Sequence, residues 1–190
     1  MISMSRFSNL IGFDDSPFPR DHKGNVRIVG TVYAGLRLDG VLFGNIRRDG
    51  ANATGNIIKL ISESKFAEHI QMIMLQGIAF GGFNVVDIHY LNRSLNLPVL
   101  VVARHKPDMD AVKKALLTNV PGGILKWRLI EKAGCMEPAG NLFIQRAGLT
   151  VDEAKETIER FAVHSNIPEP LRTAHLIAGA AATGESRGRA

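Results

Sequence analysis

The sequence predicts an α/β domain with a mixed five-stranded sheet flanked by helices, and three observations lead to it. First, 45% of the 190 residues are hydrophobic and 22% are charged, which is typical of a globular chain with a packed core. Second, the first third of the chain has the alternating polarity of strands. Third, strand-like and helix-like segments alternate further on, as in parallel strands joined by crossover helices. We expect one domain over residues 1–182 and a flexible tail over 183–190.

The first third of the chain is expected to form three strands, over residues 9–13, 26–35 and 41–46. The first is a short apolar run that ends at the acidic pair Asp14 and Asp15, as a buried strand would. The other two alternate in polarity, with Asp39 and Gly40 between them. Because Asp-Gly is a common hairpin turn, the second and third strands should be antiparallel.

The remaining two thirds contain helices and strands in turn. Helices are expected at residues 52–62, 85–95, 110–120 (from Asp108 or Asp110), 124–133, 151–162 and 171–182, and strands at 70–75, 99–103 and an edge strand at 141–145. Asn84 is placed to cap the second helix, after a glycine-rich connection over residues 77–82. Thr150 and Glu153 form a capping box. The small residues of the last helix indicate close packing against a neighbour.

This order of elements is the ribonuclease H-like layout, in which the first strand lies next to the fourth. Carboxylates at the ends of those strands can then share divalent metal ions. Fold alone does not give function, so the site residues must carry that argument.

Composition and charge narrow the functional classes. The net charge of +5 and the pI of about 9.6 favour binding to a polyanion such as nucleic acid, although such a charge also serves solubility. Cys135 is the only cysteine, which excludes an internal disulfide and a cysteine-cluster zinc site. No apolar run approaches the ~20 residues that cross a bilayer, and residues 1–9 lack a secretory signal. We therefore expect a cytoplasmic protein that does not bind a membrane.

Acidic residues at strand ends are the candidates for a metal site. Asp14 and Asp15 follow the first strand, and Asp49 follows the third. Carboxylate oxygens are the ligands that Mg²⁺ prefers, and a two-metal nuclease needs several of them. The alternative is a pair of solvated turns, because Asp is common after strands. The fourth strand ends at Gln76, where an active metal site would need a carboxylate.

The segment Gly81-Gly82-Phe83-Asn84 is expected to lead into a helix N-terminus. Free backbone N–H groups at such a point can hold a phosphate, although a tight strand-to-helix turn explains the glycines equally well. Asp87 lies in the first turn of the same helix. It either complements the helix dipole or adds a metal ligand.

Basic residues near the predicted strand ends are candidates for phosphate contacts. They are Arg47, Arg48, Arg104, His105, Lys106 and Arg172. Arg172 and His175 are three residues apart on the last helix, so they share a face and can approach the site together. The alternative for Arg104, His105 and Lys106 is a set of exposed loop residues without a ligand, and the alternative for Arg172 and His175 is that they only cover the edge of the site.

Several motifs resemble the endonuclease dU family, which is distantly related to endonuclease V. They occupy residues 11–18, 49–54 and 75–87, and the most specific is the Gly-Phe-Asn-Val-Val-Asp stretch at residues 82–87. Residues 167–175 also resemble the closing helix of endonuclease V proteins, and residues 97–104 resemble their strand that ends in a basic residue. The resemblance spans about residues 8–182.

The resemblance implies a Mg²⁺- or Mn²⁺-dependent DNA-repair endonuclease that acts at deaminated bases, uracil especially. By position, Asp14 would be the principal metal ligand and Asp49 the second carboxylate. Arg104 would lie near the phosphate, where endonuclease V has a lysine, and His175 would assist the metal or the attacking water. The glycine-rich loop would pass close to the damaged strand.

Two residues depart from the family pattern, which has Asp at the positions of Gln76 and Asn52. Losing the fourth-strand carboxylate leaves more of the metal's charge unneutralised, so Mg²⁺ binding should weaken. The enzyme is then weakened or inactive, or Asp15 or Asp87 replaces the missing ligand. A non-catalytic nucleic-acid-binding relative is the second hypothesis. A protein that binds a phosphorylated small molecule at residues 81–84 is the third.

Overall fold

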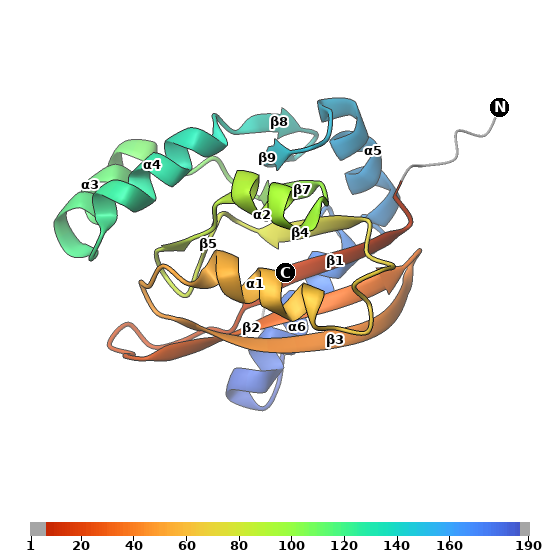
Figure 1. Ribbon diagram of the computed structural model, residues 1–190, viewed down its shortest axis with the longest axis horizontal. Coiled ribbons are helices and arrows are strands. Elements are labelled where there is room, and N and C mark those ends of the chain that lie inside the picture. The colour runs from red at the N-terminus through yellow and green to blue at the C-terminus, as the bar shows by residue number, and fades with distance from the viewer. Residues whose placement is uncertain (1–6, 187–190) are drawn as a thin grey trace.

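The computed structural model describes residues 7–186, which contain a seven-stranded mixed sheet with strand order β3-β2-β1-β4-β7-β9-β8 (Figure 1). Its central strands β1, β4 and β7 are mutually parallel, and each outer strand pairs antiparallel to its neighbour. The strands are β1 (Asn9–Asp15), β2 (Asn25–Ala34), β3 (Arg37–Arg47), β4 (Met72–Gln76), β7 (Val99–Ala103), β8 (Glu137–Ala139) and β9 (Leu142–Ala147). The expected mixed sheet flanked by helices is confirmed, but five strands was an undercount.

The undercount comes from the edge of the sheet. The strand expected at residues 141–145 is present as β9, but it lies inside the sheet because β8 pairs with its outer side. Strand β8 has three residues, one of them Pro138, which is too short for a periodic pattern. Proline lacks an N–H donor and is therefore tolerated at such an edge.

The hairpin turn between β2 and β3 lies at Gly35, not at Asp39 and Gly40 as the sequence suggested. Ala34 pairs with Arg37, and Gly35 has a φ of +59°, which glycine adopts without strain. Gly40 lies inside β3, where an added Cβ would approach the Phe66 ring to 2.2 Å. Gly40 therefore provides room for a packed ring instead of making a turn.

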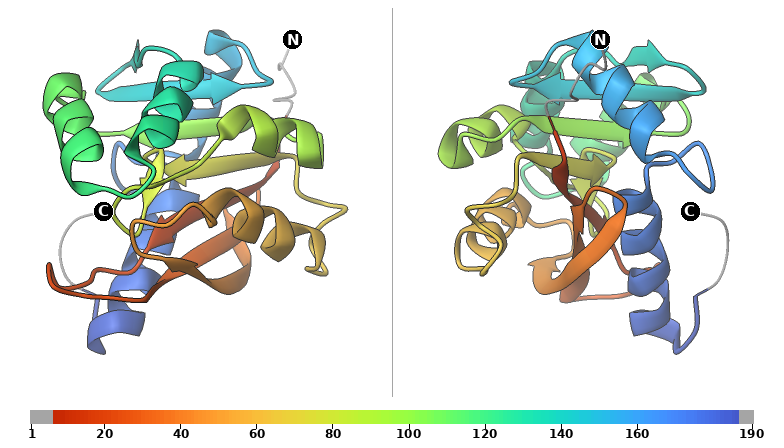
Figure 2. Two further views of the ribbon diagram at one scale, coloured as in Figure 1. Left: turned by 60° about the vertical axis from the view of Figure 1, so that its left-hand side comes forward. Right: turned by 90° about the vertical axis from the view of Figure 1, so that its right-hand side faces the viewer.

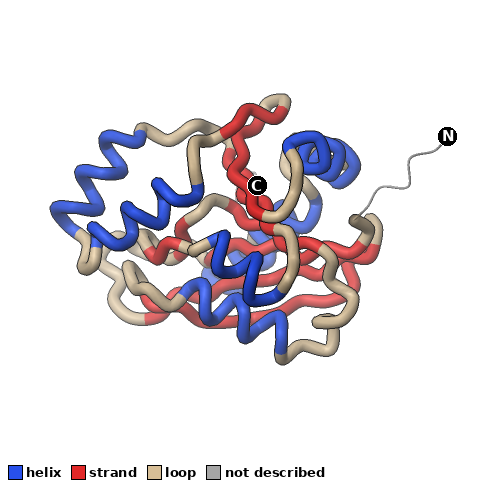
Figure 3. Tube along the Cα trace, turned by 45° about the horizontal axis from the view of Figure 1, so that its top comes forward, coloured by secondary structure: helices blue, strands red, loops and turns tan. Residues whose placement is uncertain are grey.

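Helices cover both faces of the sheet. One face carries α1 (Ala53–Ser62) and α2 (Ile88–Leu95), and the other carries α5 (Val151–Phe161) and α6 (Glu169–Thr183), as the right-hand view of Figure 2 shows for α1 and α6. The helices α3 (Met109–Asn119) and α4 (Gly123–Ala133) pack on each other to one side of the strands (Figure 3). The capping box at Thr150 and Glu153 is confirmed as the start of α5.

The start of α2 differs from the expectation. The helix begins at Ile88, and Asp87 is its N-cap, accepting a 2.9 Å hydrogen bond from the Tyr90 backbone N–H. Asn84 instead belongs to a small separate hairpin of β5 (Ala79–Phe80) and β6 (Asn84–Val85). Its amide is already committed elsewhere, because it accepts from the Ala53 N–H and donates to the Arg47 carbonyl.

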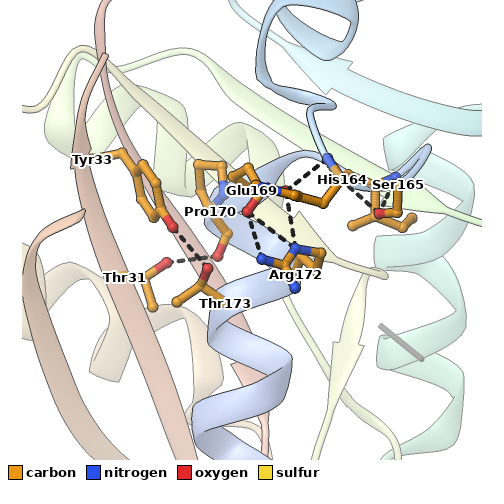
Figure 4. A network of polar contacts seen from close by, with 9 residues as sticks. Thr31, Tyr33, His164, Ser165, Glu169, Pro170, Arg172 and Thr173 are labelled. Atoms are coloured by element: carbon orange, nitrogen blue, oxygen red, sulfur yellow. Dashed lines mark hydrogen bonds and ion pairs between the residues drawn. The ribbon is translucent and has the colours of Figure 1, made fainter. Parts of the chain in front are cut away.

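Helix α6 lies directly against β1 and β2 at Gly12. A Cβ at Gly12 would lie 2.6 Å from the backbone carbon of Pro170, so only glycine allows this approach. Two side chains of β2 fasten the helix: the Thr31 hydroxyl donates to the Pro170 carbonyl at 2.6 Å, and the Tyr33 hydroxyl lies 2.7 Å from that of Thr173 (Figure 4). The close packing expected from the small residues of this helix is therefore present.

Two further expectations concern the ends of the chain and membranes. Helix α6 ends at Thr183, and residues 187–190 of the expected tail lie outside the described residues. Among residues 7–186, no helix combines the length and the apolar content that crossing a bilayer requires.

The Gly12 contact can be tested with a pair of glycine substitutions. Gly12→Ala should lower the free energy of unfolding by about 1–3 kcal/mol, because α6 must move away from β1. Gly55→Ala in α1 should raise it by about 0.5–1 kcal/mol, because alanine favours a helix and no atom lies within 4 Å of the added methyl group. Urea denaturation measures both. Equal stability of wild type and Gly12→Ala would contradict the close approach.

Candidate active site

The carboxyl ends of the parallel strands bring together residues that the sequence analysis selected. Phe13 of β1 pairs with Leu75 of β4, so Asp14 and Gln76 come next on neighbouring strands. Because side chains alternate along a strand, both point to the face that α6 covers. Arg104 follows directly after β7, the next strand in the sheet. We call Asp14, Gln76, Arg104 and His175 the strand-end site.

Asp14 is buried and bonded to His175. Its Oδ2 accepts a 2.8 Å hydrogen bond from Nδ1 of His175, and its Oδ1 accepts one of 2.9 Å from the backbone N–H of Asp15. The hydrogen bond to Asp14 raises the pKa of His175, while burial and the positive charge of Arg104 act in the opposite direction. The carboxylate thus favours the imidazolium form and fixes the orientation of the ring.

Gln76 supplies an unsatisfied oxygen. Its Oε1 is buried and has no hydrogen-bond partner among residues 7–186. A buried carbonyl oxygen without a donor favours a cation or an ordered water nearby. Together with the adjacent carboxylate it gives two oxygen donors of the hard type that Mg²⁺ binds, so the residues fit a divalent ion. The pair carries a single negative charge, and the described part of the chain holds no group of three or more His, Cys, Asp and Glu arranged for a metal.

Asp15 points to the opposite face of the sheet from Asp14. Its Oδ2 accepts a 2.8 Å hydrogen bond from the backbone N–H of Gly81. Burial, followed by the negative charge of Asp14, raises the pKa of Asp15 to about 6, although the bond from Gly81 lowers it in part. Asp15 is therefore a carboxyl group that takes up a proton near neutral pH.

Asp49 also binds the hairpin of β5 and β6. Its Oδ1 accepts a 2.8 Å hydrogen bond from the Phe83 N–H, and its Oδ2 lies 3.2 Å from Nε of Arg48. The backbone adopts a φ of +50°, and its carbonyl accepts a hydrogen bond from Nζ of the buried Lys126. The sequence analysis did not select Lys126. Its only signal in the sequence is its position among the apolar residues of α4.

The glycine segment forms a tight turn that binds carboxylates, so of the two alternatives, a turn and a phosphate-binding loop, the described contacts match the turn. Gly81 and Gly82 have φ values of +53° and +83° and form the turn between β5 and β6, so the expected helix N-terminus at Asn84 is wrong. The N–H groups of Gly81 and Phe83 already bind Asp15 and Asp49. A Cβ at Gly82 would lie 2.4 Å from the Asp49 Oδ1, so the turn needs glycine there.

Asp87 and Asn52 have structural roles, because their side chains bond to neighbouring elements. Asp87 caps α2 and forms a 2.8 Å ion pair with Lys132. Burial acts to raise the pKa of Asp87, but the hydrogen bonds from Lys132 and the backbone outweigh it, and the pKa is lowered. Asn52 accepts hydrogen bonds at its Oδ1 from the Arg47 N–H and the Asn84 amide. The carboxylate of Asp87 and the side-chain oxygen of Asn52 are therefore both engaged within the fold.

The basic candidates are distributed over several surroundings. Arg48 lies beside Asp49 and 5.4 Å from the Phe18 ring, and it donates to the His22 carbonyl. Arg172 points to Glu169 instead of the strand-end site. The exposed members are Arg47, His105 and Lys106.

A mainly apolar cavity of about 270 Å³ lies beside the hairpin. Its walls come from the hairpin, the loop after β7, and α3 and α4, and they include Ile78, Phe83, Met109 and Met136. His105 and Gln145 are the polar side chains on its wall. Gly77, which follows β4, and Ala103, the last residue of β7, also line the cavity. The cavity is thus close to the strands that carry the site.

The fold is shared with endonuclease V. The crystal structure of the Ciona intestinalis enzyme, in complex with a 24mer DNA containing an inosine followed by a ribo-adenosine, matches with a TM-score of 0.56 and 15% identity. The match covers 90% of this chain and 84% of that one. At this identity the similarity shows a common fold, so the expected endonuclease V-like architecture is confirmed.

The chain belongs to the endonuclease dU family, whose model matches residues 6–182. A UPF0215 protein of Deinococcus radiodurans is 54% identical over 184 residues, with 97% of this chain and 94% of that protein covered. The crystal structure of a protein of unknown function from Archaeoglobus fulgidus has a TM-score of 0.84 and 38% identity, covering 92% of this chain and 97% of that one. The resemblance seen in the sequence motifs is thereby confirmed.

The raised pKa of Asp15 predicts a pH-dependent effect of Asp15→Asn. Between the ordinary value of 3.8 and about 6, the unfolded state loses this proton before the folded state does, so the wild type loses stability as the pH rises through that window. The metal-free variant should match wild type below about pH 4 and be more stable by about 1–3 kcal/mol above about pH 7. Urea denaturation across the pH range measures the difference.

The matched control is Asp39→Asn, which removes an exposed carboxylate paired with Arg37. Its difference from wild type should stay small at every pH, because exposed ion pairs contribute little. A constant difference for Asp15→Asn across the window would contradict the buried, protonated Asp15.

Proposed function

We propose that the protein is a divalent-metal-dependent endonuclease that cuts DNA at deaminated bases, uracil in particular. The observation that carries the proposal is the buried Asp14 at the end of β1, hydrogen-bonded to His175 and adjacent to the unsatisfied oxygen of Gln76. Membership of the endonuclease dU family supports nuclease chemistry at this position. The net charge of +5 supports a polyanionic substrate.

The metal would be held by the Asp14 carboxylate and Oε1 of Gln76. When bound, Mg²⁺ or Mn²⁺ promotes deprotonation of water and neutralises charge on the phosphate. Gln76 is neutral, so the site neutralises less of the ion's charge than two carboxylates would. We therefore expect weak metal binding and activity that depends on high metal concentration.

His175 and Arg104 would act on the phosphate. Nδ1 of His175 is engaged with Asp14, so Nε2 is the nitrogen that can face a substrate. The imidazolium favoured by Asp14 can donate a hydrogen bond or a proton from Nε2 to a phosphate oxygen. Arg104 makes no ion pair with a residue in the range 7–186, so its charge is available to the same phosphate.

Base recognition would occur in the apolar cavity beside the hairpin. Enzymes that act at a damaged base extrude it from the stack into a pocket, at a cost that is lowest for an unpaired base. The cavity of about 270 Å³ offers apolar walls at Phe83 and Met109, with His105 and Gln145 as polar contacts. The hairpin that forms one wall also binds Asp15, the residue after Asp14 in β1, so the cavity and the strand-end site are connected through that strand.

The second candidate function is a non-catalytic nucleic-acid-binding protein. The neutral Gln76 favours it, because the residue stands at the strand end where a carboxylate would complete a metal site. Asp87, one possible replacement, is committed to capping α2 and to Lys132. Under this reading the fold and positive charge persist while cleavage is lost.

The nuclease proposal is tested by cleavage of uracil-containing and plain DNA, single- and double-stranded, with Mg²⁺ or Mn²⁺. Wild type should nick the uracil strand, and Asp14→Asn should abolish nicking. His175→Gln should slow it by about 10²–10⁴-fold, because a proton donor is lost. Gln76→Asp should lower the metal concentration needed for half-maximal rate. Asp39→Asn is the control carboxylate variant and should cut like wild type.

The other outcomes separate the candidates. If wild type is silent but Gln76→Asp cuts, the non-catalytic reading holds and the site has lost its activity through that residue. If no variant cuts but all bind DNA with an affinity that falls steeply with salt, the same reading holds. If no variant cuts or binds DNA, both candidates fail.

A further inference from the structure

A second, polar cavity of about 540 Å³ lies next to the strand-end site. It is bounded by α6, the turn between β8 and β9, and the connection between α5 and α6. Its volume is within the ~300–1,000 Å³ range of small-molecule sites. None of its lining residues is acidic, and the polar side chains on its wall are Arg104, His105, Asn141, His164, Ser165, Asn166 and Arg172.

The buried carboxylate of Glu169 behind this wall is already engaged by cationic side chains of the wall. Glu169 is 5% exposed and accepts hydrogen bonds from Nε and Nη2 of Arg172 at 2.9 and 2.8 Å (Figure 4). His164 also contacts it, with Nδ1 3.1 Å from Oε1. Glu169 therefore fixes the Arg172 guanidinium in place, and Nη1 of Arg172 makes no hydrogen bond within residues 7–186. A held guanidinium with a free edge suits a phosphate.

The remaining wall combines uncommitted amides with apolar surface. The side chains of Asn141 and Asn166 form no hydrogen bond with residues of the described range 7–186. Leu142, Ile167 and Leu176 supply the apolar part. A ligand that matches this wall carries an anionic group at one end and a flat or apolar body with polar edges at the other. A nucleotide has that composition.

Arg104 connects the cavity to the strand-end site. It lines the cavity together with Leu176, the residue after His175, and it follows β7, whose Val102 pairs with Gln76. It makes no ion pair with a described residue (7–186) that would turn it away. A strand with one phosphate at Asp14 and His175 would therefore meet Arg104 next and enter this cavity.

We propose that this polar cavity holds one nucleotide of the nucleic-acid strand, adjacent to the phosphodiester at the strand-end site, with its phosphate on Arg104 and Arg172. The inference rests on the proposed function, since it places the substrate strand relative to the site.

Binding of fluorescent single-stranded uracil DNA, followed by anisotropy in EDTA, tests the proposal without cleavage. One set of oligonucleotides is shortened by single nucleotides on the 5′ side of the uracil and another on the 3′ side. In one set, removal of a particular nucleotide should weaken wild-type binding by about 10-fold, the equivalent of roughly 1.4 kcal/mol. Asn166→Asp should weaken binding of the full-length strand to a similar degree and be insensitive to that removal.

Asn166→Asp is the chosen variant because it keeps the shape of an exposed side chain and adds a negative charge to the cavity wall. The matched control is Asn96→Asp, at the exposed C-cap of α2, where the φ of +52° suits either residue. The control should bind every oligonucleotide like wild type. Equal full-length binding by the two variants would overturn the proposal.

A second arm separates a strand nucleotide from a free one. A free 5′-mononucleotide is titrated into the protein while the amide resonances of Asn141 and Asn166 are followed by NMR. If it binds there and strand truncation has no effect, the cavity is a mononucleotide site and the strand proposal fails. If the protein cuts DNA but Asn166→Asp binds like wild type, this inference alone fails. If it never cuts but the truncation effect appears, only the nuclease proposal fails.

Discussion

The close approach of α6 to β1 at Gly12 is the constraint on which the site depends. Because no side chain separates the two backbones, the helix lies along the strand and carries His175 over Asp14. The same helix brings Glu169 and Arg172 to the wall of the polar cavity. The absence of a side chain at Gly12, in the middle of β1, thus sets the position of the His175 imidazole and the Arg172 guanidinium on the helix. Packing at Gly12 places the helix, and the hydrogen bonds from Thr31 and to Asp14 then fix the helix and the imidazole in that position.

Backbone amides of the β5–β6 hairpin control the acidic residues on the other face. Gly81 and Phe83 each donate one N–H to a carboxylate, so Asp15 and Asp49 are held on either side of a single turn. Hydrogen bonds to the charged form lower the free energy of a carboxylate, but burial beside Asp14 outweighs this for Asp15. The three carboxylates therefore have different roles. Asp14 is bonded to an imidazole, whereas Asp15 and Asp49 order the turn that forms a wall of the apolar cavity.

Sequence patterns predicted the elements whose cause is local. The strand at residues 99–103 is a continuous apolar run between a proline and a basic residue, and it matches β7 residue for residue. The Thr150 capping box depends on residues three apart, so it was readable too. The predictions for Gly40 and Asn84 were wrong because the roles of these residues depend on partners that are distant in the sequence. The Phe66 ring packs over Gly40, and the Ala53 N–H donates to the Asn84 side chain. Asp14 and His175 could be proposed singly, but their 161-residue separation hides the hydrogen bond between them.

The buried Lys126 gives the α3–α4 pair a role beyond that of a peripheral attachment. Its ammonium group donates to the carbonyl of Asp49 while the side chain is almost completely removed from water. Lys126 belongs to α4, so withdrawing the helix would break this hydrogen bond and leave the Asp49 carbonyl without its donor. Because α3 packs on α4, this hydrogen bond attaches the helical pair to the loop after β3. The wall of the apolar cavity includes Ile130 of the same helix, so the bond between Lys126 and Asp49 also fixes the position of that wall.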